Sequence, residues 1–110
     1  MIIGIAGRYS ADTEEEQAAN LAALNEAAAR LLQKGHIPLI GLNAALPVVQ
    51  NAAVTDRYSA IMDISMAVIN GCEALLLLSE SPGANQERDL ILAKGLPVYY
   101  SLHDVPDVPE

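Results

Sequence analysis

The chain of 110 residues is long enough for one domain, because two separate cores of half that length would each be too small to be stable. Its hydrophobic fraction of 52% is ample for a packed core, although that core contains no Phe or Trp. A net charge of −8 excludes a broad nucleic-acid or anionic-membrane surface, since both require clustered Lys and Arg. A small phosphorylated ligand is still compatible with this charge, because it needs only a few local donors.

The cysteine content and the amino-terminal sequence together favour a location in the cytoplasm. Cys72 is the single cysteine, so an internal disulfide is excluded and a reducing environment is favoured. No basic region precedes an apolar run at the amino terminus, and no apolar run approaches the length of a bilayer span. We therefore expect a soluble cytoplasmic protein with a single domain over residues 1–110.

The first half of the chain predicts a strand, a helix and a second strand. The apolar run MIIGIA, residues 1–6, is typical of a buried strand and is followed by the turn GRYSAD. Residues 13–35 form the clearest predicted helix, with a capping box at Thr13 and Glu16 and a terminating Gly35. The segment HIPLIGL, residues 36–42, predicts a strand whose proline favours a position at the edge of the sheet.

The second half repeats this alternation after one uncertain stretch. Residues 43–55 are expected to form an irregular excursion over one end of the sheet. Apolar residues at helical spacing follow over residues 56–72, with Ile61, Ile64 or Ser65, Val68 and Cys72 along one side. A buried strand is predicted over residues 73–79, and a helix that begins with Pro82 over residues 82–95. A last strand over residues 96–102 and a polar tail over residues 103–110 follow.

Strands that alternate with helices predict the fold class. The pattern favours an α/β fold, a Rossmann-like or flavodoxin-like three-layer sandwich with four to five parallel strands. Right-handed crossovers place every helix N-terminus at the carboxyl edge of the strands. Ligands of such folds bind at that edge, where the strand order reverses, so the functional site is expected there.

Two loops are predicted to meet at this edge, GRYS after the first strand and SESPGANQ after the third. Each leads into a helix N-terminus, where free N–H groups and the helix dipole favour an anion. Gly7 and Gly83 allow close backbone approach, and Ser10 and Ser81 add hydroxyl donors. Arg8 adds a positive charge. The pattern is neither a P-loop nor G-x-G-x-x-G, so an alternative stays open in which the glycines only form turns and Ser81 is an N-cap.

Two acids within helical segments form a second group of candidates, Glu87 and Asp63. Two carboxylates that face one pocket can act as nucleophile and proton donor when their environments separate their pKa values. Carboxylate attack on an anomeric carbon is established glycosidase chemistry. The alternative interpretation places Glu87 on a solvated face with Arg88 and Asp89, as is common for carboxylates on helices.

Other polar residues offer weaker patterns. His36 and His103 are far apart and lack the spacing of a zinc site, so no metal is expected. Cys72 is expected to pack in the core. Ser10 and Ser59 lack a G-x-S-x-G setting, and the paired Tyr99 and Tyr100 at a strand end are expected to pack.

Three stretches together resemble the nucleoside 2-deoxyribosyltransferase-like superfamily. They are the turn AGRYS, the alanine-rich helix that ends in KGH, and the segment MDISMAVINGCEALLLLSESPGANQE. Within the superfamily the chain is more similar to deoxyribonucleoside 5′-monophosphate N-glycosidases and to small uncharacterised bacterial relatives. The family's helix-initiating Asp and its Ser-x-Gly-x-x-x-Glu turn correspond to Asp63, Ser81, Gly83 and Glu87. The loop with Gly7, Arg8 and Ser10 matches less closely.

The resemblance implies a role for each matched residue. Glu87 is implied as the nucleophile that attacks C1′ of the sugar, with Asp63 positioning it or protonating the leaving base. Ser81 corresponds to the serine of members that act on monophosphates, whereas members that act on free nucleosides tend to have an Asp there. A serine suits a phosphate dianion, which a second carboxylate would repel. The implied ligand is a nucleotide, with no cofactor and no metal, and the implied assembly is a homodimer.

One departure from the family concerns the first strand. Members commonly carry a tyrosine at the position of Gly4, so Tyr9 or Tyr58 would have to take that role. The expected activity is hydrolysis of the base–sugar bond of a nucleoside 5′-monophosphate through a glycosyl–Glu87 intermediate. The alternatives are a deoxyribosyltransferase, in which a second base intercepts the intermediate, and a nucleotide sensor without catalysis. A more distant likeness is to cytokinin-riboside-monophosphate hydrolases. The segment SPGANQE of this chain only partly matches their P-G-G-x-G-T-x-x-E motif.

Overall fold

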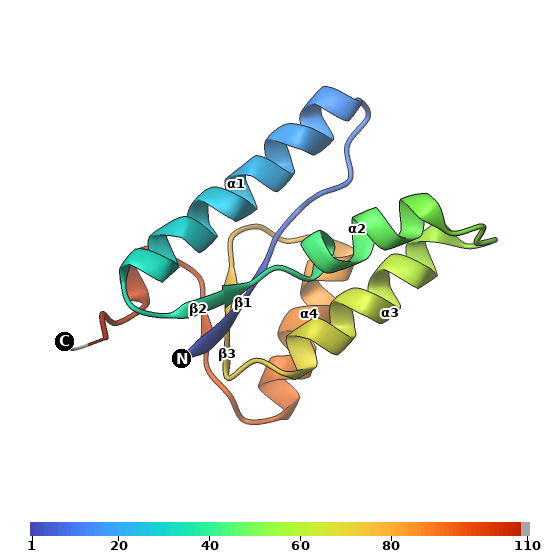
Figure 1. Cartoon of the computed structure of the whole chain (residues 1–110). Coiled ribbons are helices and arrows are strands. Elements are labelled where there is room, and N and C mark those ends of the chain that lie inside the picture. The colour runs from blue at the N-terminus through green and yellow to red at the C-terminus, as the bar shows by residue number, and fades with distance from the viewer. Residues whose placement is uncertain (109–110) are drawn as a thin grey trace.

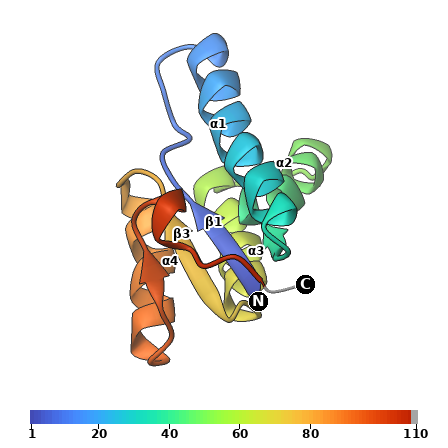
Figure 2. The same cartoon turned by 90° about the vertical axis from the view of Figure 1, so that its left-hand side faces the viewer.

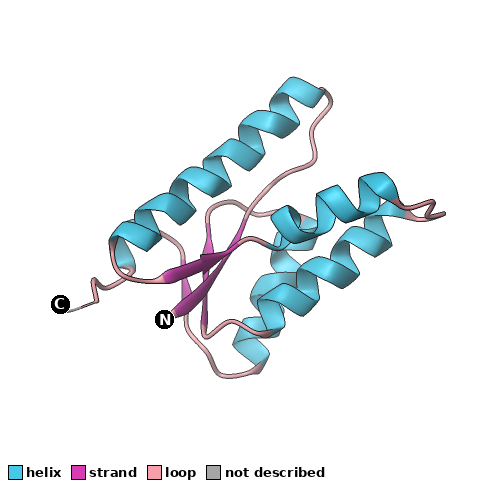
Figure 3. Cartoon of the chain, viewed as in Figure 1, coloured by secondary structure: helices cyan, strands magenta, loops and turns pink. Residues whose placement is uncertain are grey.

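A computed structural model describes residues 1–108 and contains a parallel sheet between two layers of helices. The strands are β1 (Ile2–Ala6), β2 (Ile37–Leu39), β3 (Ala74–Leu77) and β4 (Val98–Tyr99). The helices are α1 (Glu14–Gln33), α2 (Gly41–Asn51), α3 (Arg57–Asn70), α4 (Pro82–Ala93) and the 3-10 turn η1 (Leu102–Asp104). Figure 1 shows their arrangement, and Figure 3 shows the strands lying between the long helix and the other helices.

The sheet has the strand order β2-β1-β3-β4, and all of its described pairs are parallel. This confirms the predicted α/β fold class, with four strands. After β1 the chain forms β2 on one side of β1, and it later forms β3 on the other side of β1. The order therefore reverses between β1 and β3, which is where an open parallel sheet leaves a crevice beyond its strand ends.

Side chains alternate between the two faces of β1 and supply two cores. Ile3 and Ile5 pack against α1, together with Leu24 and Leu31 of that helix. The opposite face carries Ala6 and packs against residues of β3, α3 and α4. Figures 1 and 2 show α2 and α3 side by side, on the side of the sheet away from α1.

Three features predicted for the first half are observed: the cap of the long helix, its terminating glycine and the edge proline. The strand predicted over residues 96–102 is shorter, since β4 is Val98–Tyr99 and Leu102 begins η1. Thr13 Oγ1 accepts a hydrogen bond from Glu16 N at 3.1 Å, which is the expected N-cap of α1. Gly35 has φ +95, a left-handed conformation that favours glycine at a helix end. Pro38 lies in β2 at the edge of the sheet, as its sequence predicts. The predicted tail runs into residues 109–110, which lie outside the described residues.

The prediction of an irregular excursion over residues 43–55 is wrong. Most of this stretch is α2, which begins at Gly41 and ends at Asn51 with Pro47 inside it. The helix holds because its apolar side is buried against the rest of the fold, with Ala45, Leu46 and Val49 all buried. Tertiary packing therefore outweighs the local cost of the proline. In the described residues no helix is long and apolar enough to cross a membrane.

Candidate functional site

A pocket of about 590 Å³ lies beyond the carboxyl ends of β1 and β3. Its walls come from the β1–α1 loop, the first turns of α2 and α4, and one side of α3. The site that the sequence placed at this edge of the sheet therefore has a cavity. Helix α1 also contributes Gln17 and Leu24, so four helices converge on the pocket. Its chemistry therefore depends on tertiary structure rather than on one continuous motif.

Glu87 lies on the inner side of α4 and lines this pocket, with only 7% of its surface exposed. It is not on the solvated face that the alternative interpretation assigned to it. Burial raises the pKa of its carboxyl to about 7, while a hydrogen bond from Ser65 acts in the opposite direction. At neutral pH this group therefore exists in both protonation states, which suits a carboxyl that must act and then be regenerated.

The two oxygens of Glu87 have different surroundings. Oε1 accepts a hydrogen bond from Ser65 Oγ at 2.5 Å. Oε2 makes no hydrogen bond to the described residues. It is also not completely buried, because Asn85 Oδ1 is the one fully buried side-chain atom without a partner in these residues. Because Glu87 lines the pocket, we infer that Oε2 is the oxygen available to a ligand.

Asp63 is not brought to Glu87. It is exposed on α3 and does not line the pocket, whereas Ser65, two residues later, is buried and does. Two residues correspond to about 200° around a helix, so the two side chains leave α3 on opposite sides. The assisting role implied for Asp63 stays a prediction without a contact in this structure.

The sequence analysis did not identify Ser65 as a site residue. A signal was present, because Ser65 falls on the side of the helix that carries apolar residues, where an unpaired hydroxyl would be costly. A serine in such a position needs a polar partner, either a carbonyl of its own helix or a group from another element. The sequence does not say which one, and the structure supplies Glu87 from α4.

The two predicted loops do meet at the pocket. The backbone N–H of Arg8 donates to Ser79 Oγ at 2.8 Å and so joins the β1–α1 loop to the segment after β3. A Cβ at Gly7 would lie 2.8 Å from Leu24 and 3.1 Å from Ser79, so glycine permits the close approach there. Gly7, Arg8 and Ser10 all line the pocket, as expected.

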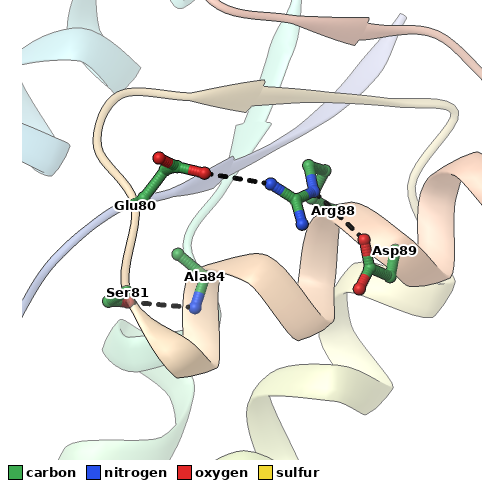
Figure 4. Close-up of polar contacts among 5 residues, drawn as sticks. All are labelled: Glu80, Ser81, Ala84, Arg88 and Asp89. Atoms are coloured by element: carbon green, nitrogen blue, oxygen red, sulfur yellow. Dashed lines mark hydrogen bonds and ion pairs between the residues drawn. The ribbon is translucent and has the colours of Figure 1, made fainter.

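The N-terminus of α4 forms another part of the wall. Ser81 is its N-cap, and its Oγ accepts from Ala84 N at 3.1 Å (Figure 4). The capping interpretation of Ser81 is therefore confirmed, and its hydroxyl proton is still available to a ligand. Gly83 also lines the pocket, and a Cβ there would lie 3.0 Å from the sulfur of Met62.

Two arginines supply positive charge at the pocket, Arg8 and Arg57. Both are exposed, and within residues 1–108 neither forms an ion pair. Arg88 differs, because it pairs with Glu80 at 3.2 Å and with Asp89 at 3.1 Å (Figure 4). Arg57 was missed by the sequence analysis, although the rule that places helix N-termini at the carboxyl edge would have put the start of the predicted helix 56–72 near the two loops.

Tyr9 and Tyr58 both line the pocket, as required of candidates for the missing first-strand tyrosine. Tyr58 is half exposed, and its hydroxyl accepts from Gln86 Nε2 at 3.5 Å. Gly4 itself does not line the pocket. A Cβ at Gly4 would lie 2.6 Å from Cδ1 of Ile69 and 3.2 Å from Sγ of Cys72, so the side chain of Ile69 would have to move before a larger residue fitted there.

The histidines and the cysteine lie elsewhere. His36 is buried between the amino group of Met1, 3.0 Å from its Nδ1, and the carbonyl of Pro106, 2.6 Å from its Nε2. Cys72 is buried, and its thiol donates to the carbonyl of Val68 at 3.5 Å. Over residues 1–108, no group of three or more His, Cys, Asp or Glu side chains is arranged to hold a metal ion.

The sequence of residues 2–100 matches the family described as "Domain of unknown function (DUF4406)". The chain belongs to this family. The match runs from β1 to the end of β4 and so includes the whole pocket. No curated protein matches the chain. The DUF4406 description states no activity, so a functional assignment has to rest on the site itself.

Proposed function

We propose that this DUF4406 domain is an N-glycosidase that cleaves the base–sugar bond of a nucleoside 5′-monophosphate. The observation that carries the proposal is the buried Glu87, which lines a pocket at the carboxyl edge of the sheet and whose second carboxylate oxygen makes no hydrogen bond to the described residues. A volume of about 590 Å³ lies within the usual range for pockets that enclose small molecules. A carboxylate in this setting has few structural uses, because burial without a cationic partner is unfavourable.

In the proposed reaction Oε2 of Glu87 attacks C1′ and forms a C1′–O ester bond. The C1′–N bond breaks, its electron pair leaves with the base, and the base takes a proton from water. A second water then attacks C1′, loses its proton to solvent and restores the carboxylate. The products are the free base and the sugar 5-phosphate, so all atoms are accounted for without a cofactor.

The phosphate is proposed to bind at the mouth of the pocket. At the N-terminus of α4, Pro82 has no N–H and Ala84 N donates to Ser81 Oγ, so the N–H of Gly83 is the backbone donor left for a phosphate in the described residues. The hydroxyl of Ser81 can also donate, and Arg8 and Arg57 add charge from two other elements. Ser81 and Glu87 are six residues apart on one helix, about 9 Å along its axis. The sugar of a monophosphate would then lie between the phosphate and the nucleophile.

The assay is release of free base by the purified chain from each ribonucleoside and 2′-deoxyribonucleoside 5′-monophosphate. We expect release from at least one monophosphate and much slower release from the matching nucleoside, which lacks the group held at α4. No release from any monophosphate would contradict the proposal, and equal rates for nucleotide and nucleoside would contradict the phosphate site.

Replacing Arg57 with Gln should raise KM for the monophosphate by about tenfold while changing kcat little, because one charge-assisted contact to phosphate is lost. The same variant should leave the KM for the matching nucleoside unchanged. Steady-state kinetics on both substrates make the comparison. Arg30→Gln is the matched control, since Arg30 is exposed on α1 and pairs only with Glu26 at 3.4 Å in the described residues. An equal rise in KM for the nucleoside would mean that Arg57 does not contact phosphate.

A second candidate function is nucleotide binding without catalysis. It is favoured by the exposure of Asp63 outside the pocket and by the glycine at position 4, where the resembled family commonly has a tyrosine. Calorimetry with the same nucleotides separates the two functions. Binding with no base release above the buffer rate would support the sensor, whereas base release removes it.

A further inference from the structure

Ser65 and Glu87 form a buried polar pair between α3 and α4. Ser65 is 1% exposed and Glu87 is 7% exposed, and the hydroxyl of Ser65 donates to Oε1 over 2.5 Å. Within the described residues this is the single hydrogen bond to the Glu87 carboxylate, and no ion pair supplements it. The orientation of Glu87 therefore depends on one serine.

The position of Ser65 is in turn fixed by Gly41 at the start of α2. A Cβ added at Gly41 would lie 2.8 Å from both the Cα and the Cβ of Ser65, and closer still to its hydroxyl. Real side chains do not make such contacts, so the backbone of α2 is packed directly against Ser65. This contact closes one side of the serine and limits where its hydroxyl can point.

We propose that Ser65 is the positioning residue of the pocket: it holds Oε1 of Glu87 so that Oε2 faces the ligand, and it favours the ionised form of that carboxyl. The catalytic consequence rests on the proposed function, but the contact itself does not. A hydroxyl donor binds an ionised carboxylate more strongly than a neutral carboxyl, so the serine opposes the effect of burial. It keeps part of the Glu87 population ionised at neutral pH.

The pocket contains other titratable groups, but none of them replaces Ser65 as the partner of Glu87. Those that line it are Arg8 and Tyr9 from the β1–α1 loop, Arg57 and Tyr58 from α3, and Glu80 before α4. The side chains that α2 contributes cannot titrate. Cys72 lies near enough for Glu87 to help raise the pKa of its thiol, after the larger effect of burial. None of these groups donates a hydrogen bond to Glu87 in the described residues, so Ser65 is the group to change.

The test is the Ser65→Ala variant, with the ionisation of Glu87 followed by ¹³C NMR of its carboxyl carbon. Alanine is the best helix former, so α3 should be retained. We expect the pKa of Glu87 to rise by about one unit, because the donor that favours the charged form is lost. The acid limb of the base-release profile should move upward by the same amount. The rate at high pH should fall about tenfold, because Oε2 is no longer held in place.

Ser59→Ala is the matched control. Ser59 lies on the same helix and its hydroxyl donates to the carboxylate of Asp56 at 2.9 Å, but it does not line the pocket. This control should leave the pKa of Glu87 and the rate profile unchanged. A folded Ser65→Ala variant with an unchanged pKa of Glu87 would overturn the proposal.

The two readouts separate failure of this inference from failure of the proposed function. A raised pKa in the variant, together with no base release from the wild type, would support the role of Ser65 and reject the glycosidase. Base release by the wild type, with a pKa and a rate profile that Ser65→Ala does not alter, would support the glycosidase and reject the role of Ser65.

Discussion

Replacing Glu87 with Gln should reduce base release by at least about a thousandfold, because the amide oxygen cannot form the glycosyl intermediate. The substitution keeps the size of the side chain and an oxygen that can accept from Ser65, so the pocket should keep its shape. Nucleotide affinity, measured by calorimetry, should therefore change little. A large loss of turnover with retained binding is the pattern expected of a nucleophile.

Asp89→Asn provides the control for this variant. Asp89 lies on the same helix and is an acid, but it is exposed and pairs with Arg88 rather than facing the pocket (Figure 4). Its turnover should stay within about twofold of the wild type. Turnover by Glu87→Gln close to that of Asp89→Asn would remove Glu87 as the nucleophile.

The sheet and three of the helices could be predicted because their signals are local. β3 is a continuous apolar run that is buried on both faces, and α1 begins at a threonine cap and ends before a glycine with positive φ. These features depend on neighbouring residues in the chain. The same holds for Pro82, which begins α4 directly after the capping Ser81.

α2 could not be predicted in this way because its stability is not local. Its first residue is a glycine, no side chain caps its N-terminus, and Pro47 lies within it. Each of these features favours a turn when it is considered alone. The helix depends instead on its packing against α3, where Gly41 lies directly against Ser65.

The site was predicted in part for a related reason. Glu87 and the two loops follow from the general rule that parallel strands end at one edge, together with the family resemblance. The partner of Glu87 depends on the rotation of α3 about its own axis. The pattern of apolar residues already put Ser65 on the inner side of this helix, whereas Asp63 was chosen because it is an acid and matches the family motif. Asp63 and Ser65 show that a helix can be assigned correctly while the residue facing the pocket is not.

The protonation of Glu87 should also make the stability of the fold depend on pH. Its pKa in the folded state is about 7, raised from the ordinary value of 4.5, chiefly by burial. The folded state therefore binds more protons than the unfolded state between these values, and the contribution of this group to stability falls as pH rises through about 7. From pH 5 to pH 8.5 the loss should be on the order of 2 to 3 kcal/mol, because ionised Glu87 is costly to bury.

Glu87→Gln removes this dependence, since the amide is neutral throughout. Urea unfolding of both proteins at several pH values isolates the effect, because every other ionisable side chain is common to the two chains. The variant should gain on the order of 2 to 3 kcal/mol relative to the wild type between pH 5 and pH 8.5. Glu15→Gln, at an exposed position in the first turn of α1, should show a constant difference over the same range. A constant difference for Glu87→Gln as well would mean that Glu87 is ionised at pH 5 in the folded state. Burial would then not raise its pKa, and the acid limb expected for base release near pH 7 would have to come from another group.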